Sequence, residues 1–241
     1  MKIYALTDKG VNKDLNEDRV IVNKEIISDG KIETVLYDGI FAIADGVGGN
    51  NGGAKASQFV AEKLIDLIEV DNNSLRKINE DLLLSSIVEI SNSNMATTLS
   101  GIQIKKDSCN LFSIGNTRVY ILQGKVYLKQ LTTDDSTLNY LLKTGQLSQS
   151  DITSFNRKNE ITACFGGGNA RYFKDMVSSI DSINNSFIIT SDGIHDYIDI
   201  DQMEEIIRDF GISLDACECF KEIARLNGST DDISIIIGCM E

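Results

Sequence analysis

The long amphipathic segments of this chain occur in pairs, and runs of short strands lie before, between and after the pairs. Apolar residues recur with helical spacing over residues 53–68 and 75–90, and again over residues 202–210 and 214–226. A doubly wound parallel sheet alternates single helices with single strands, so this order argues against that fold. The order predicts an α+β chain in one domain, with two antiparallel sheets and a helix pair packed outside each sheet.

The strand predictions rest on alternating side chains and on turn residues. In residues 2–7, Ile3 and Ala5 point to one face while Tyr4 and Leu6 point to the other. The sequence also predicts a short helix at residues 138–144 and a mobile, irregular flap at residues 147–159. The further strands that it predicts are residues 19–23, 25–27, 32–37, 41–44, 96–104, 109–114, 119–122, 126–131, 180–183, 187–190 and 233–239.

The strand at residues 41–44 ends in an aspartate and a loop rich in glycine. Asp45 and Gly46 follow the strand, and the next eight residues contain four glycines before a helical pattern begins. Glycines allow positive φ and close backbone approach, and a carboxylate is an oxygen donor that suits a hard cation. This stretch alone fits either an ion site or a plain strand–turn–helix connection with an exposed aspartate.

Three other acidic positions lie at strand ends in the same way. Asp192 follows an apolar strand, Asp231 precedes the final strand, and Asp18 precedes the second strand. If these ends converge, Asp45, Asp192 and Asp231 form a cluster of carboxylates whose mutual repulsion requires cations, and all-oxygen ligands select Mg²⁺ or Mn²⁺. Each aspartate alone also fits a turn residue or a strand cap, but three with matching apolar neighbours favour the metal site.

Composition excludes several functional classes. A net charge of −13 argues against nucleic-acid binding, which needs a basic face. The sequence has no apolar run near 18 residues and no signal peptide at its start, so we expect a cytoplasmic protein that does not bind membranes. Five cysteines are an odd number without the paired spacing of a zinc site, which indicates reduced thiols.

Rival catalytic motifs are absent or misplaced. His195 is the only histidine, so the chain has no Ser-His-Asp triad and no His-rich metal site. Cys219 and Arg225 have the C-x₅-R spacing of cysteine phosphatases, but the residues between them form part of an amphipathic helix instead of a Gly-rich phosphate loop. No GxxxxGK[ST] loop is present, which excludes a P-loop NTPase.

The order of these motifs resembles the metal-dependent serine/threonine protein phosphatases, the PPM or type 2C family, in their compact bacterial form. Many motifs in sequence order make this resemblance specific, and it runs nearly from end to end. The matching segments are residues 10–18 (GVNKDLNED), 45–57 (DGVGGNNGGAKAS), 95–99 (MATTL), 114–120 (IGNTRVY), 131–136 (LTTDDS), 141–147 (LLKTGQL), 161–166 (ITACFG), 191–196 (SDGIHD) and 229–234 (STDDIS).

The resemblance implies a four-layer α/β/β/α sandwich that forms a single phosphatase domain over residues 1–241, with two Mn²⁺ or Mg²⁺ ions. It implies that a hydroxide bridging the metals attacks phosphorus in line, so that no protein nucleophile is needed. Catalysis is expected to depend on Asp45, Asp192 and Asp231 acting through this metal-activated water. The metal ligands that it implies are Asp18, Asp45, Gly46 through its carbonyl, Asp192 and Asp231, with Asp18 and Glu17 acting largely through water.

Several positions differ from the family pattern. Lys13 replaces the usual phosphate-binding arginine; it is expected to bind phosphate as a point charge, and a solvated lysine is an equally good interpretation. Asn116 replaces an aspartate of a third metal site whose other carboxylate is Asp196, so we expect a third metal to bind weakly or not at all. Asp232 replaces an asparagine and adds negative charge beside Asp231.

The predicted function is therefore an Mg²⁺- or Mn²⁺-dependent phosphoserine/phosphothreonine protein phosphatase in signalling. Its expected partner is a phosphorylated protein substrate, linked to a cognate Ser/Thr kinase or its targets, and the phosphatase itself is expected to be a monomer. Lys13 and Asn116 leave one alternative open, a phosphatase-like domain with little or no activity that binds a phosphoprotein or a regulatory partner. A phosphatase dedicated to one partner is a third interpretation that the sequence does not separate from the first.

Overall fold

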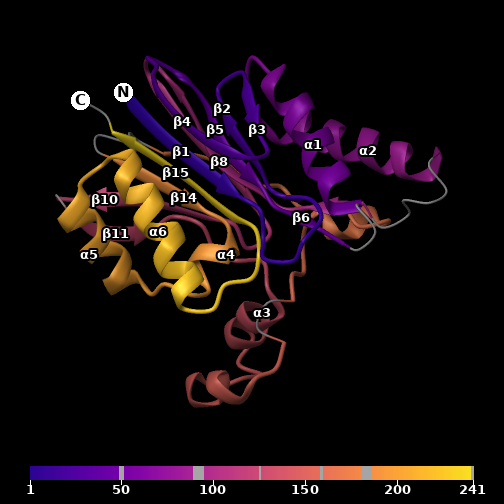
Figure 1. The fold of residues 1–241 in the computed structure, drawn as a ribbon. Coiled ribbons are helices and arrows are strands. Elements are labelled where there is room, and N and C mark those ends of the chain that lie inside the picture. The colour runs from indigo at the N-terminus through magenta and orange to yellow at the C-terminus, as the bar shows by residue number, and fades with distance from the viewer. Residues whose placement is uncertain (49–51, 89–94, 125, 158–159, 181–185, 240–241) are drawn as a thin grey trace.

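Two six-stranded antiparallel sheets form the centre of the molecule, and helices cover their outer faces (Figure 1). The computed structural model describes residues 1–48, 52–88, 95–124, 126–157, 160–180 and 186–239. Helices α1 (Gly52–Ile65) and α2 (Asn72–Val88) lie on one side, and α5 (Ile200–Phe210) and α6 (Leu214–Leu226) lie on the other. This arrangement confirms the predicted α/β/β/α sandwich with a helix pair on each side.

Hydrogen bonding places strands from both ends of the chain next to one another. The first sheet has the order β11 (Tyr127–Gln130), β10 (Arg118–Gln123), β14 (Phe187–Thr190), β15 (Ile233–Cys239), β1 (Lys2–Asp8) and β4 (Gly30–Val35). The second has the order β13 (Val177–Ile180), β9 (Ser108–Ile114), β8 (Leu99–Lys105), β5 (Gly39–Ala44), β2 (Arg19–Val22) and β3 (Glu25–Ile27). A small third sheet contains β12 (Phe165–Gly166), β7 (Ala96–Thr97) and β6 (Gly46–Val47).

Strand β1 shows why the sequence folds into layers. Its residues Ile3 and Ala5 lie in the apolar cluster between the two sheets, and Tyr4 and Leu6 lie in the cluster beneath α5 and α6. The alternation predicted for this strand is therefore confirmed, with both faces buried. Across the layer between the sheets, the rings of Phe41 and Phe187 lie with centroids 5.6 Å apart.

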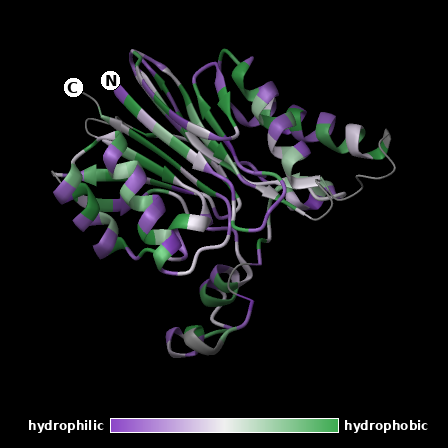
Figure 2. Cartoon of the chain, in the orientation of Figure 1, coloured by the Kyte–Doolittle hydropathy of each residue, from purple (hydrophilic) through white to green (hydrophobic). Residues whose placement is uncertain are grey.

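The helix pairs begin and end at residues with a local reason to do so. Asp199 and Gln202 form a capping box at the start of α5, and the Oγ of Ser213 accepts from the N–H of Ala216 at the start of α6. Figure 2 shows mixed colours on these helices and mostly hydrophobic colours on the central strands, as expected for helices with only one buried side. The bounds of α6, β14 and β15 match the predicted ranges, and the predicted end of the second helix at residue 90 lies outside the described residues.

The structure differs from the sequence prediction at two places that matter for the site. The strand predicted at residues 96–104 is broken at Thr98 into β7 and β8. Asp192, predicted to lie in a turn, is the first residue of a short helix, α4 (Asp192–His195). In both cases contacts with distant segments, described below, override the local pattern.

A segment between β11 and β12 extends away from the sandwich (Figure 1). It contains α3 (Thr137–Lys143), which confirms the predicted short helix, and the 3₁₀ helix η1 (Gln149–Ser154), where the sequence predicted an irregular flap. A second 3₁₀ helix, η2 (Ala170–Tyr172), precedes β13. Within the described ranges, no helix has the length and apolar character needed to cross a membrane.

Candidate active site

Asp45 is held by the break in the strand at Thr98. Its N–H donates to Thr98 Oγ1 at 3.2 Å. Its carbonyl accepts from the N–H of Thr98 at 2.8 Å and from Thr97 Oγ1 at 2.9 Å. Because three hydrogen bonds fix its backbone, Asp45 leaves the end of β5 in one orientation. The threonines that interrupt the predicted strand therefore position the central aspartate.

Two serines join the end of β14 to the start of β15. The N–H of Ser191 donates to the carbonyl of Ser234, and the N–H of Ser234 donates to Ser191 Oγ, both at 3.0 Å. This reciprocal pair places Asp192, at the start of α4, close to Asp231, just before β15. Asp192 Oδ2 also accepts from Asn116 Nδ2 at 2.9 Å. Two aspartates 39 positions apart in the chain are thus brought together by backbone pairing, as the sequence predicted.

Asp18 lies beneath this pair, in a pocket of hydroxyl groups. Ser234 Oγ donates to Asp18 Oδ2 at 2.6 Å, and only 1% of the Asp18 residue surface is exposed. Burial, and then the nearby charges of Asp232 and Asp192, raise the pKa of Asp18 to about 7. Asp18 does not line the cavity described next, and its predicted contact with a metal through water stays a prediction.

A cavity of about 230 Å³ brings most of the predicted site residues together. Burial raises the pKa of Asp45 well above its usual range, and the neighbouring charges of Asp192, Asp18 and Asp231 raise it further. Among the described residues, the positive charge near these carboxylates is therefore too small to balance their negative charge. The residues that line the cavity are Lys13, Glu17, Asp45, Gly46, Val47, Gly48, Asn116, Ile161, Asp192 and Asp231.

Lys13 brings a positive charge to this cluster. Its Nζ forms an ion pair with Asp231 Oδ1 and donates to Asp232 Oδ2 at 3.0 Å. Burial alone would lower the pKa of Lys13, but hydrogen bonds to Asp231 and Asp232 raise it above its usual value. The alternative of a solvated lysine in a polar loop is therefore wrong for this structure.

Among the described residues, no three His, Cys, Asp or Glu side chains are arranged as a ready metal site. Asp231 is paired with Lys13, and Asp192 accepts a hydrogen bond from Asn116. The donor chemistry nevertheless fits hard divalent cations, because carboxylate oxygens surround the cavity and their raised pKa values show repulsion that a cation would relieve. The donor types of the residues present thus fit Mg²⁺ or Mn²⁺.

Gly46 is required by close backbone contact. A Cβ at Gly46 would lie 2.4 Å from the carbonyl carbon and oxygen of Gly53, in the first turn of α1. Gly46 does not have a positive φ, whereas Gly48 does, with φ 132°. The sequence analysis gave Gly46 the role of a metal ligand through its carbonyl, and this stays a prediction. The structure shows in addition that the missing side chain of Gly46 allows the residue after β5 to pack against the start of α1.

We expect Gly46→Ala to destabilise the protein by about 1–3 kcal/mol, because a methyl group there displaces backbone atoms. The measurement is the free energy of unfolding in urea, read by circular dichroism. Gly145→Ala is the control, because its Cβ meets open space and only its φ of 70° adds strain. Equal stability of Gly46→Ala and the wild type would contradict the packing role of Gly46.

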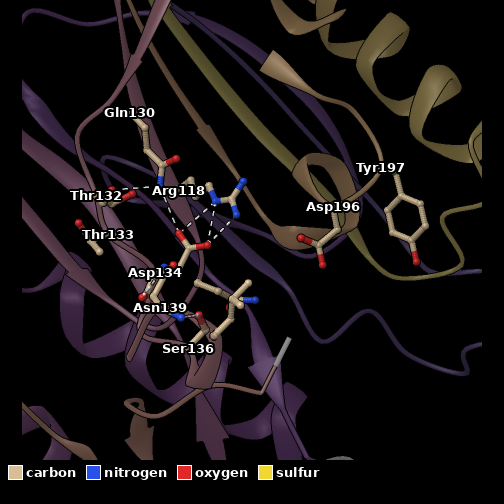
Figure 3. A pocket seen from close by; sticks show the side chains of 11 residues that line it. Arg118, Gln130, Thr132, Thr133, Asp134, Ser136, Asn139, Asp196 and Tyr197 are labelled. Atoms are coloured by element: carbon tan, nitrogen blue, oxygen red, sulfur yellow. Dashed lines mark hydrogen bonds and ion pairs between the residues drawn. The ribbon is translucent and has the colours of Figure 1, made fainter. Parts of the chain in front are cut away.

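A larger cavity of about 690 Å³ adjoins the first and shares Asn116 with it. On one side Arg118 donates from Nε and Nη2 to the carboxylate of Asp134, at 3.0 and 2.6 Å, and Asp196 and Tyr197 lie across the cavity (Figure 3). Asn116 and Asp196, the residues predicted for a weak third metal, both line it. Arg118 and Asp134 lie in segments that match the family pattern, but their pairing was not predicted. The signal for it in the sequence is the opposite charge of two residues in neighbouring motifs.

Solved structures of bacterial phosphatases have the same fold. The serine/threonine phosphatase PstP/Ppp of Mycobacterium tuberculosis superposes with a TM-score of 0.83 at 22% identity, over 100% of both chains. The catalytic domain of the serine threonine protein phosphatase PstP in complex with two manganese ions has a TM-score of 0.77 at 21% identity, over 98% of both chains. At this identity the likeness concerns the fold alone.

Sequence comparison identifies the family. The chain is 26% identical to the serine/threonine phosphatase stp of Listeria monocytogenes, over 96% of this chain and 92% of that protein. It is also 26% identical to the protein phosphatase PhpP of Streptococcus pneumoniae, over 100% of this chain and 98% of that protein. The sequence model described as "Protein phosphatase 2C" matches residues 31–226, and the chain therefore belongs to the protein phosphatase 2C family.

Proposed function

We propose that this chain is an Mn²⁺- or Mg²⁺-dependent protein phosphatase for phosphoserine and phosphothreonine. The observation that carries the proposal is the convergence of Asp45, Asp192 and Asp231 on one cavity, in a chain of the protein phosphatase 2C family. The two manganese ions in the solved PstP catalytic domain support the same choice of metal. The proposal also treats residues 1–241 as one phosphatase domain.

The metal-binding residues that we propose are those the sequence predicted. Asp45, with the carbonyl of Gly46, would be shared by two ions, and Asp192 and Asp231 would hold the first of them. Asp18 and Glu17 would act on the second through water. When bound, the ions supply an activated water for in-line attack on phosphorus and stabilise charge on the phosphoryl group.

The other residues of the chain orient these groups. Asn116 Nδ2 donates to Asp192 Oδ2 and so helps to orient this carboxylate. Ser234 fixes Asp18 from below through its hydroxyl. Lys13 supplies the positive charge for the phosphoryl oxygens. Since Asn116 is neutral and is already engaged with Asp192, we expect any third ion at Asn116 and Asp196 to bind weakly.

The proposed substrate is a phosphorylated protein, and a cognate Ser/Thr kinase is the source of phosphate that fits it. The phosphatase is proposed to act as a monomer. The rival function is a domain that binds phosphoprotein without hydrolysing it, and the pairing of Lys13 with Asp231 is the observation that favours it. The following experiment separates the two.

We expect the purified protein to hydrolyse a small aryl phosphomonoester in Mn²⁺, and to lose that activity when the metal is chelated. Asp192→Asn should lower kcat/KM by about 100-fold or more, because it removes one charge from the proposed metal ligands. The control is Asp66→Asn, an exposed aspartate just beyond the end of α1. Absence of turnover in Mn²⁺, with binding of a phosphopeptide retained, would instead support the binding domain.

A further inference from the structure

Two residues that differ from the family pattern, Lys13 and Asp232, contact each other in the folded chain. Lys13 Nζ lies 3.0 Å from Asp232 Oδ2 and also pairs with Asp231. The Asp232 side chain is 3% exposed, whereas those of Lys13 and Asp231 are 33% and 47% exposed. A lysine at the edge of the cavity is thus anchored on a buried carboxylate 219 positions away in the chain.

The backbone of the loop that carries Lys13 fixes the Asp232 carboxylate. The N–H of Gly10 donates to Asp232 Oδ1 at 2.7 Å, and the N–H of Glu17 donates to Oδ2 at 2.8 Å. The N–H of Val11 adds a bond to the carbonyl of Thr230 at 2.9 Å. Asp232 therefore fastens both ends of the Lys13 loop and is itself held rigidly by two charge-assisted hydrogen bonds.

The chemistry of lysine explains why this anchor is a carboxylate. An ammonium is a flexible point charge on a long stem and lacks the planar fork by which arginine orients itself on phosphate. An asparagine at 232 would offer one oxygen and one N–H₂, so its N–H₂ would face either the N–H of Gly10 or the donors of Glu17 and Lys13. Asp232 presents acceptors to all of them and so supplies the orientation that lysine lacks.

We propose that Asp232 is a positioning residue that holds the Lys13 ammonium between the metal-binding carboxylate of Asp231 and the site of the phosphoryl group. Lys13 then has two tasks. It is a counter-ion that an entering metal displaces from Asp231, and it is the phosphate-binding cation once Asp232 alone retains it. The counter-ion task rests on the metal binding proposed above for Asp231 but not on hydrolysis, whereas the phosphate-binding task rests on the whole of the proposed function.

Metal titration without substrate tests the counter-ion task. Lys13→Met should bind Mn²⁺ about tenfold more tightly than the wild type in calorimetry, because the metal no longer competes with an ion pair at Asp231. Lys9→Met is the matched control, since it removes a charge from the same loop at a residue whose Nζ bonds only weakly, at 3.4 Å, to the carbonyl of Asp14. An unchanged dissociation constant in Lys13→Met, or an equal gain in Lys9→Met, would overturn the counter-ion task.

A double-mutant cycle tests the positioning by Asp232. In saturating Mn²⁺, Lys13→Met and Asp232→Asn should each raise KM for the aryl phosphomonoester about tenfold while kcat changes less than about threefold, and the double variant should be no worse than either. Independent, multiplying effects on KM would overturn the proposal. Asp14→Asn, an exposed acid in the same loop, is the control. If the wild type shows no turnover, the same cycle is read from the affinity for inorganic phosphate, so failure of the proposed function is recognised separately.

A rescue separates positioning from a merely structural role of Asp232. Because arginine orients its own fork on phosphate, Lys13→Arg in the Asp232→Asn background should restore KM to within about threefold of the wild type. If Asp232 served only to fold the loop, the arginine would not restore KM, and that result would overturn the proposal. Circular dichroism on each variant confirms that the compared proteins are folded.

Discussion

Asp45→Ala is expected to lower metal-dependent hydrolysis on the order of 1000-fold, the largest loss of any single substitution in this chain. The reason is its place in the cluster. Asp192, Asp18 and Asp231 all raise the pKa of Asp45, so its carboxylate lies close enough to each of them to interact. Removal of Asp45 takes away the ligand that both proposed ions share, while Asp231 is paired with Lys13 and Asp192 accepts from Asn116.

The same substitution should leave the chain folded. Three hydrogen bonds hold the backbone of Asp45, and none of them uses its side chain. Without metal, loss of a buried and repelled carboxylate should keep or raise the urea midpoint relative to the wild type. The measurement pairs kcat/KM in Mn²⁺ with urea unfolding in a chelator, and Asp45→Asn repeats it with the side-chain volume conserved. Activity within tenfold of the wild type, in a folded Asp45→Ala, would mean that the site lies elsewhere.

The sequence was sufficient to predict the layers of the fold and the carboxylates at the strand ends. In β1, Ile3 and Ala5 belong to one apolar cluster, and Tyr4 and Leu6 belong to another. The sequence predicts this assignment because successive side chains of any strand point to opposite faces. Helix α6 was predicted to the residue because Ser213 caps one end and Asn227 follows the other. The convergence of the aspartates also followed from local pattern once the strand ends were assumed to meet.

The sequence was not sufficient where distant segments compete with local pattern. Thr98 lies in a run with good strand character, yet its hydroxyl and N–H bond to Asp45, and this contact divides the strand. The ion pair between Lys13 and Asp232 connects residues that are 219 positions apart in the chain. Each was seen separately as a departure from the family pattern, but no periodicity connects them. Their pairing depends on the register between β1 and β15, which local sequence does not encode.

Stability should fall as pH rises when no divalent cation is present, and Mn²⁺ should reverse this trend. Folding raises the pKa of Asp18 from its ordinary 3.8 to about 7, and it also raises the pKa values of Asp45 and Asp192. Between pH 4 and pH 7 the folded chain therefore binds more protons than the unfolded chain. The stability that these carboxyl groups contribute is complete below pH 4 and is lost as the pH rises through 7. The pKa values of Glu17 and Asp196 are raised in the same way. His195, whose buried ring has a pKa well below 6.5, acts in the opposite direction.

A divalent cation takes the place of those protons, and its affinity rises as the carboxylates ionise. Saturation to about 100 times the dissociation constant stabilises the folded state by about 2.7 kcal/mol. The gain in melting temperature from Mn²⁺ over a chelator should therefore be larger at pH 8 than at pH 5.5. Asp18→Asn should flatten the fall seen in the chelator, since the amide still accepts from Ser234 but does not titrate. A gain in melting temperature that is equal at both pH values would show that the ion does not bind at these carboxylates.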